Sequence, residues 1–352
     1  AGISMTVVPQ SVWYAHSPAV APLIVALHKG WLADGLSQQG IGFQSVSGHA
    51  DPAIRRSYSD HYLNFQIRQG GNVPALWARS NGANTRLVGL TWTQEFQAIV
   101  TLPKTGIKTA KDLTGRRYAV PRFAPLGYQV LAPFAIRGLV NARAAEGLDI
   151  AGIELVDVHV GRDAAGQGET FGRFAPKRLA IYADESLALL RGEIDAFYVK
   201  GSEGIAAASF IGASVVSEFG FHPDINIRVN AGTPRPLTVD QAFIDARPDL
   251  VDLLVGEIAS VGDWANQNRA EAIAILAREN NVGEHFANLA LGDDLRTALG
   301  LTLEVGELRA FEAYKQFLLE WKFLDKDFPL DAWVAPQHLA AAKNFQKTKA
   351  RP

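Results

Sequence analysis

The chain has 352 residues, which exceeds the usual length of a single domain and predicts two compact units. Its net charge of −2 provides no basic surface for nucleic acid and no polybasic segment for a membrane. It contains no cysteine, which excludes disulfides, thiolate metal sites and cysteine nucleophiles.

The first third of the chain alternates strand and helix patterns. Strands are predicted at 11–14, 41–46, 86–90 and 96–102, and helices at 20–29 and 73–79. A strand–helix–strand order is typical of α/β proteins. We therefore expect a mixed α/β fold.

The middle third continues this alternation. A turn, a short helix and a strand are predicted within 106–121, followed by a helix at 126–140 and a strand at 153–160. The polar, glycine-rich stretch 161–172 predicts a surface loop. Further on we expect a helix at 184–191, a strand at 196–199, a helix from near Ser202 and a strand at 214–217.

The last third is mostly helical. Two short strands, 227–229 and 236–239, are expected on either side of a loop at 230–235. Apolar residues at three- and four-residue spacing then predict helices at 250–267, 269–279 and 303–321.

No apolar run approaches the roughly 18–20 residues of a membrane helix, so we expect a protein that is not embedded in a membrane. The only methionine is Met5, which leaves two interpretations of the first four residues. They are the start of a processed chain, which would be exported or periplasmic. Alternatively they precede a natural start at Met5, and the protein would then be cytoplasmic.

Two sequence motifs resemble those of the substrate-binding proteins of ABC importers for sulfonates and nitrate. The first is Ile-Lys-x-x-x-Asp-Leu-x-Gly-Arg-Arg within 106–121, and the second is Arg-Pro-Asp-Leu at 247–250 followed by Trp-Ala-Asn-Gln-Asn at 264–268 and Glu-Ala at 271–272. The resemblance implies a two-lobed periplasmic-binding-protein-like (type II) fold with a hinge and an inter-lobe cleft.

The same resemblance implies how the lobes divide the chain. Residues 1–98 and 223–352 would form the first lobe, with the C-terminal part mostly helical, and residues 99–222 would form the second. The crossings between lobes would lie near 96–102 and 217–230.

Other segments are similar to the hydroxybiphenyl sulfinate desulfinase branch of this superfamily. They are Trp-Tyr-Ala-His-Ser-Pro at 13–18, Asp-His at 60–61, Arg-Gln-Gly-Gly-Asn-Val-Pro at 68–74 and Leu-Asp-Ala-Trp-Val-Ala-Pro at 330–336. In that branch a cysteine works with a histidine, an arginine and a glycine amide. The matching positions here are Ser17, His61, Arg68 and Gly71, so a serine replaces the cysteine.

The residues around Arg68 suit an oxyanion. Its guanidinium offers a planar fork of donors that fits two oxygens of a sulfonate, sulfinate or carboxylate. Gly70 and Gly71 allow close backbone approach, and a helix that begins near Val73 and Pro74 presents amides to an anion. The alternative is a surface arginine beside a glycine turn.

Ser17 and His61 each have two interpretations. Ser17 is either a ligand contact or a turn and capping residue before the first helix. His61 either contacts the anion and moves a proton or is a structural histidine. As a nucleophile Ser17 is a poor substitute for a thiol, because its hydroxyl needs an aligned base and an oxyanion hole.

Second-lobe candidates follow the ends of predicted strands, where open α/β sheets place their ligands. Arg122, Lys200 and Gly201 occupy such positions, either as the second half of an anion clamp or as solvated surface residues. Thr233 and Arg235 are further candidates in the loop beside the hinge. Trp13 and Tyr14 would line an apolar part of the ligand or pack in the core.

No cofactor is expected. Gly166-Gln167-Gly168 lacks the spacing of a dinucleotide fingerprint, and neither a His-Glu-x-x-His pattern nor a Walker loop is present.

Two functions follow from the resemblance. The main one is a monomeric solute-binding protein that captures a sulfonate-like organic anion for an ABC permease. The alternative is a desulfinase-like hydrolase that cleaves the C–S bond of an aryl sulfinate, with Ser17 at the nucleophile position; a sensor domain and a vitamin-precursor binder stay open as well.

Overall fold

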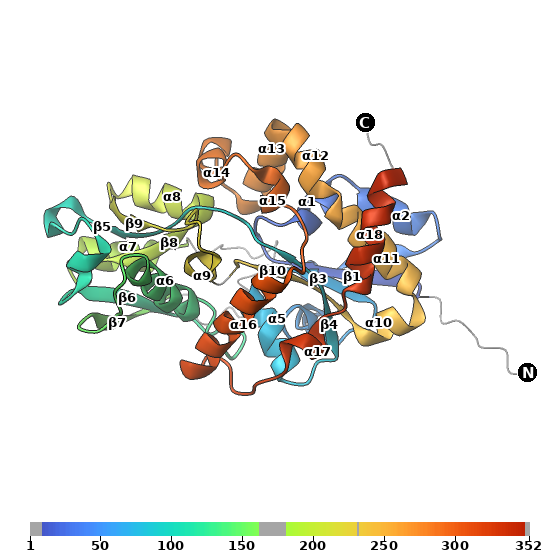
Figure 1. Cartoon of the computed structure of the whole chain (residues 1–352), viewed down its shortest axis with the longest axis horizontal. Helices are drawn as coiled ribbons and strands as arrows, with labels where there is room; N and C mark the ends of the chain where they lie inside the picture. The colour runs from blue at the N-terminus through green and yellow to red at the C-terminus, as the bar shows by residue number, and fades with distance from the viewer. Residues whose placement is uncertain (1–8, 162–180, 231, 349–352) are drawn as a thin grey trace, which may run out of the picture.

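A five-stranded sheet forms the centre of the first lobe in the computed structural model, which describes residues 9–161, 181–230 and 232–348. Its strands are β1 (Ser11–His16), β2 (Gly42–Ser45), β3 (Gln66–Gln69), β4 (Thr85–Thr91) and β10 (Arg235–Asp240), in the order β2-β1-β3-β10-β4. Strand β1 is parallel to β2 and β3, whereas β10 is antiparallel to both of its neighbours. The sheet therefore joins the N-terminal third of the chain to a strand that follows the second lobe (Figure 1).

Helices cover both faces of this sheet. One core contains buried side chains of β1, β3 and β10 together with those of α1 (Pro22–His28), α2 (Trp31–Ser37), α11 (Pro248–Ala259), α12 (Val261–Gln267) and α13 (Arg269–Asn280). A second core combines β4 with α5 (Asn72–Ser80), α16 (Val305–Glu320) and α17 (Leu330–Trp333). Proline in the first turn helps to start α1 and α11. The lobe also contains α3 (Pro52–Arg55), α4 (Ser57–Asp60), α10 (Gln241–Ala246), α14 (Glu284–Ala290), α15 (Leu295–Ala298) and α18 (Gln337–Thr348).

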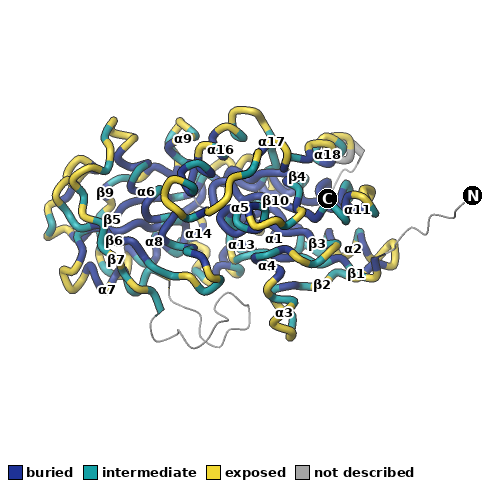
Figure 2. The backbone as a smooth tube through the Cα atoms, turned by 90° about the horizontal axis from the view of Figure 1, so that it is seen from below, coloured by how far each residue is buried: buried dark blue, intermediate teal, exposed yellow. Residues whose placement is uncertain are grey.

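The second lobe contains a three-stranded sheet in the order β8-β5-β9 and a parallel pair, β6 and β7. The strands are β5 (Gln97–Thr101), β6 (Arg117–Arg122), β7 (Glu154–His159), β8 (Phe197–Lys200) and β9 (Ser214–Glu218), and a bridge between Tyr118 and Ala196 joins the two groups. They pack with α6 (Ala132–Ala144), α7 (Ala183–Leu190), α8 (Gly201–Phe210) and the short helices η1 (Pro103–Thr105) and η2 (Ala110–Leu113). Figure 2 shows buried strands inside both lobes and exposed residues on the outer turns.

The chain passes between the lobes twice. It leaves β4 for β5 through 92–96, and it returns from β9 to β10 through α9 (Ile225–Arg228). A further contact joins the lobes, because Phe210 of α8 meets Phe286 of α14 with ring centroids 6.0 Å apart. Among the described residues, no helix is long and apolar enough to cross a membrane.

Most of the expected elements are present, and four expectations are wrong or incomplete. The segment 227–229 lies in or beside helix α9 and is not a strand, because Asp224 caps this helix by accepting from the Asn226 amide. The helix expected at 126–140 begins only at Ala132, since Gly127 has a positive φ of 85°. The helix expected at 250–267 is divided at Ser260, and β3 was not expected at all. All but the first residue of the loop expected at 161–172 lies outside the described residues.

Candidate functional site

Ser17, Arg68 and Gly70 converge at the carboxyl end of β1 and β3. These strands are parallel and pair Ala15 with Arg68, so the residues that follow them meet at the same edge of the sheet. A Cβ atom on Gly70 would lie 2.8 Å from Ser17 Oγ and 3.6 Å from Arg68 Nη2. Only glycine therefore fits at position 70 without displacing the Ser17 hydroxyl.

The Arg68 side chain is held in place by neutral groups. Its Nε donates to the Tyr58 carbonyl at 2.9 Å, its Nη1 donates to the Gly71 carbonyl at 3.3 Å, and the guanidinium lies 4.6 Å from the Tyr58 ring centroid. Arg68 is only 2% exposed, and its Nη2 has no hydrogen-bond partner. A buried cation is costly without a counter-charge, so this geometry suits a bound anion.

The start of helix α5 adds donors at the same place. Gly71 is the N-cap residue, and the first amides of a helix have no partner within the helix. Asn72 donates through Nδ2 to the carbonyls of Asn230 at 2.8 Å and Pro234 at 3.1 Å. Its Oδ1 is buried and has no partner, so Asn72 is a polar residue of this region that the sequence did not indicate.

Gln69 and Tyr128 are two more residues that sequence reasoning missed. Gln69 accepts from the Leu23 amide at 3.0 Å and donates to Thr91 Oγ1 at 2.8 Å, which fixes the start of α1 beside the Ser17 loop. Tyr128 stacks on Trp77 with ring centroids 4.7 Å apart, and its hydroxyl has no partner. Burial raises the pKa of Tyr128 well above its ordinary value, which the nearby Tyr58 reinforces and the charge of Arg68 opposes. No local motif distinguishes these residues.

His61 occupies a different place from Ser17. It adopts a left-handed backbone conformation with φ of 49°, and its Nε2 lies 3.6 Å from Asp240 Oδ1. Asp240 accepts from the Gln66 amide at 2.8 Å, at the amino end of β3. Ser17 lies at the opposite end of that strand, so the structure pairs His61 with Asp240 rather than with Ser17.

The aromatic candidates pack toward β2. The Trp13 ring meets His49 at 5.6 Å between centroids, and the Tyr14 ring meets Phe43 at 4.4 Å. In the second lobe, Arg122 pairs with Asp157 at 2.8 Å on the sheet surface. The structure does not bring these three side chains into contact with Arg68.

Lys200 lies in a buried group between the lobes, together with Glu95 of the first crossing segment and Arg235 at the start of β10. Glu95 Oε1 lies 2.8 Å from Arg235 Nη2 and 3.1 Å from Lys200 Nζ. Burial lowers the pKa of Lys200 to about 8, an effect that Glu95 opposes and Arg235 reinforces. Burial alone would raise the pKa of Glu95, but the two cations hold it below its ordinary value. Gly201 lies beside this group, since a Cβ there would be 3.3 Å from Glu95 Oε2.

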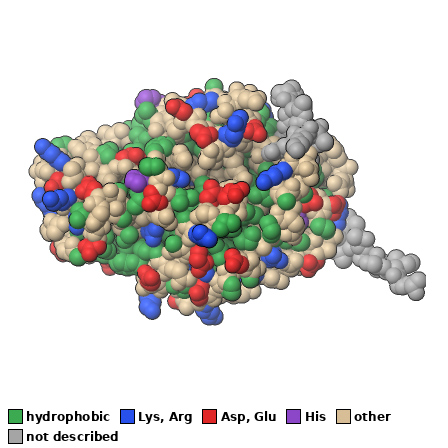
Figure 3. Space-filling view, in the orientation of Figure 1, with side chains coloured by type: hydrophobic (Ala, Val, Ile, Leu, Met, Phe, Trp, Pro, Cys, Tyr) green, Lys and Arg blue, Asp and Glu red, His purple; other side chains and the backbone are tan. Residues whose placement is uncertain are grey.

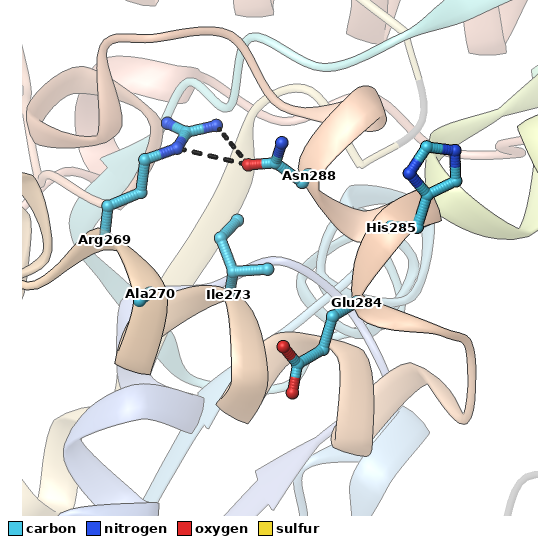
Figure 4. A pocket seen from close by; sticks show the side chains of 6 residues that line it. All are labelled: Arg269, Ala270, Ile273, Glu284, His285 and Asn288. Atoms are coloured by element: carbon cyan, nitrogen blue, oxygen red, sulfur yellow. Dashed lines mark hydrogen bonds between the residues drawn. The ribbon is translucent and has the colours of Figure 1, made fainter.

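A separate surface pocket of about 460 Å³ lies between α13 and α14 (Figure 4). It is lined by Arg269, Ala270, Ile273, Glu284, His285 and Asn288. Arg269 already binds Asn288 Oδ1 from Nε and Nη2, at 3.3 and 3.1 Å.

Across the described part of the chain, no group of three or more histidine, cysteine or acidic residues is placed to hold a metal. Positive and negative side chains are interspersed over much of the face seen in Figure 3.

Residues 17–160 match the family described as NMT1/THI5 like. The matched span contains Ser17, Arg68 and Gly70. Over this span the chain is similar to that family.

Curated and solved proteins show the same similarity that the sequence indicated. The chain is 24% identical to the 2′-hydroxybiphenyl-2-sulfinate desulfinase of Rhodococcus erythropolis over 94% of its length and 93% of that protein. A crystal structure of a cysteine-to-serine mutant of the desulfurization enzyme DSZB with biphenyl-2-sulfinic acid matches with a TM-score of 0.79 and 22% identity, covering 96% of this chain and 100% of the other. The periplasmic aliphatic sulphonate binding protein SsuA of Escherichia coli matches with a TM-score of 0.65 and 14% identity, covering 93% and 92%. The expected periplasmic-binding-protein-like fold is confirmed.

Proposed function

We propose that this protein is a solute-binding protein that captures a small organic anion of the sulfonate type. The observation that carries the proposal is the buried Arg68 guanidinium, whose unpartnered Nη2 and the Ser17 hydroxyl both lie close to Gly70. A sulfonate oxygen could accept from Arg68, a second from the Ser17 hydroxyl and a third from an amide at the start of α5.

The likeness to SsuA supports transport as the context. In this proposal the protein is exported or periplasmic and delivers its ligand to an ABC permease. The two-lobed fold supports binding by closure of the lobes around the ligand.

Titration calorimetry and thermal shift against alkyl and aryl sulfonates, aryl sulfinates, nitrate and carboxylates would test the proposal. A ligand that binds only the folded state raises the melting temperature with its concentration and affinity. We expect a sulfonate to bind, Arg68→Gln to abolish binding, and Arg247→Gln to leave it unchanged, because Arg247 pairs with Asp249 on the surface. Binding that is indifferent to Arg68, or no binding by any anion, would contradict the proposal.

A second candidate function is hydrolysis of the C–S bond of an aryl sulfinate. It is favoured by the nearly full-length likeness to a desulfinase. The sequence resemblance implies that Ser17 matches the cysteine of that branch. The geometry favours it less, because a serine hydroxyl needs a base and His61 faces Asp240. Incubation of the wild-type protein and of Ser17→Cys with biphenyl-2-sulfinate, followed by a sulfite assay, separates the functions. Turnover by the wild-type protein would establish the enzyme.

A further inference from the structure

We propose that the ligand is a bifunctional anion, with its sulfonate-like group at Arg68 and a second anionic group at Arg235 and Thr233. This inference rests on the proposed function and narrows its ligand class. The second position is a buried group between the lobes, here called the hinge cluster, which consists of Glu95, Lys200, Thr233 and Arg235.

Two polar atoms of the hinge cluster are buried without a partner. Arg235 donates from Nη2 to Glu95, but its Nη1 has no hydrogen-bond partner although the residue is only 5% exposed. The Thr233 hydroxyl is likewise buried and unpartnered. Buried donors of this kind are costly when unsatisfied, so two of them only two residues apart in the chain indicate a position built for an acceptor.

The charge of the hinge cluster favours an anionic acceptor. A single carboxylate oxygen, Glu95 Oε1, is shared by the Arg235 guanidinium and the Lys200 ammonium. The pKa of Glu95 lies below its ordinary value, so this carboxylate is ionised and already engaged. A carboxylate or second sulfonate on the ligand would accept from Arg235 Nη1 and Thr233 Oγ1.

The two anion positions lie at the same edge of the first-lobe sheet. Strand β10 runs antiparallel to β3 and pairs Leu237 with Gln69. Arg235, two residues before Leu237, therefore lies beyond the carboxyl end of β3, where Gly70 follows Gln69.

Asn72 connects the two positions. The carbonyl of the preceding residue, Gly71, accepts from Arg68, and the Asn72 side chain donates to the carbonyl of Pro234 next to Arg235. One ligand with a short spacer could therefore reach both positions. Because Lys200 belongs to the second lobe and Arg235 to the first-lobe sheet, the second anionic group would also lie between the lobes.

Matched ligand pairs test this inference by calorimetry. The first pair is propane-1-sulfonate and 3-sulfopropanoate, and the second set is benzenesulfonate with 2-, 3- and 4-sulfobenzoate, whose isomers vary the spacing. We expect at least one bifunctional ligand to bind about tenfold more tightly than its monofunctional match, because one charge-assisted hydrogen bond raises affinity by about that factor. The gain should disappear in Arg235→Gln and fall in Thr233→Val, while binding of the monofunctional sulfonate stays within about twofold.

The Arg235→Gln variant leaves Lys200 to balance Glu95, and its melting temperature checks that it folds. Arg235→Lys keeps the charge but removes the second guanidinium nitrogen, and it should lose most of the gain. Equal affinities within every matched set, or a gain that survives Arg235→Gln, would overturn the inference while leaving an Arg68-dependent sulfonate site intact. Absence of binding by all the sulfonates would overturn the proposed function and this inference together.

Discussion

The hydroxyl oxygen of Ser17 lies 2.8 Å from the point at which Gly70 would carry a Cβ atom. A methyl group there would displace the Ser17 hydroxyl and would stand in van der Waals contact with Arg68 Nη2, 3.6 Å away. We expect Gly70→Ala to weaken sulfonate binding by about tenfold or more, and calorimetry of the variant measures this. Gly306→Ala is the matched control, because a Cβ at Gly306 meets no atom within 4 Å. Unchanged affinity in Gly70→Ala would show that the ligand does not use the space beside Ser17.

Glu185 predicts a pH dependence of stability in the second lobe. Burial raises the pKa of Glu185 to about 7, so the folded protein holds a proton there that the unfolded chain releases near pH 4.5. The cost of ionising Glu185 therefore grows from about pH 4.5 to pH 7 and is complete above that, where it amounts to at most about 3 kcal/mol. We expect Glu185→Gln to raise the melting temperature at pH 8 and to change it little at pH 4.5. An equal effect at both pH values would contradict the shifted pKa.

Lys200 predicts a pH dependence of ligand affinity. Its pKa of about 8 means that its ammonium loses a proton as the pH rises from 7 to 9.5, although sulfonates and carboxylates stay ionised. Affinity for a bifunctional anion should therefore fall over this range, whereas affinity for a monofunctional sulfonate should stay nearly constant. Calorimetry at pH 7 and 9.5 measures both, and Lys200→Met should remove the difference.

The same group also affects stability, with the opposite sign. The folded pKa of Lys200 lies below the unfolded value of 10.5, so between pH 8 and 10.5 the unfolded chain holds a proton that the folded chain has lost. The contribution of Lys200 to the free energy of unfolding therefore rises with pH in this window. Urea unfolding at pH 7.5 and 9.5 measures this. Relative to the wild type, Lys200→Met should gain more free energy of unfolding at pH 7.5, where the buried lysine is charged, than at pH 9.5.

Gly138 of α6 packs directly on β8. A Cβ there would lie 2.5 Å from Tyr198 Cδ2, in a buried core. We expect Gly138→Ala to destabilise the protein by about 1–2 kcal/mol, because overpacking outweighs the better helix propensity of alanine. Urea unfolding measures the loss, and Gly306→Ala in α16 should show none. A stabilised Gly138→Ala variant would mean that the Tyr198 ring moves aside freely.

The sequence predicted most strands and several of the longer helices because their apolar spacing is regular, as in 73–79 and 303–321. It missed β3 because Gln66, Arg68 and Gln69 are polar, and their burial depends on partners distant in the sequence. Local sequence motifs were enough to indicate Ser17, Arg68 and Gly70 as candidate site residues. The sharing of Glu95 by Lys200 and Arg235 had no local signature, since the three residues come from parts of the chain that meet only in the folded protein.

Strand β10 lies between β3 and β4, although some 140 residues of chain separate it from β4. During synthesis, the ribosome therefore releases β3 and β4 long before the strand that pairs with both of them. The strands and helices from β5 to β9 come from one continuous stretch and can pair as soon as they emerge, so the second lobe can fold first. Until β10 arrives, the facing edges of β3 and β4 stay unpaired and open to association with other chains. This nascent interval, rather than the finished fold, is where the chain would depend most on chaperones.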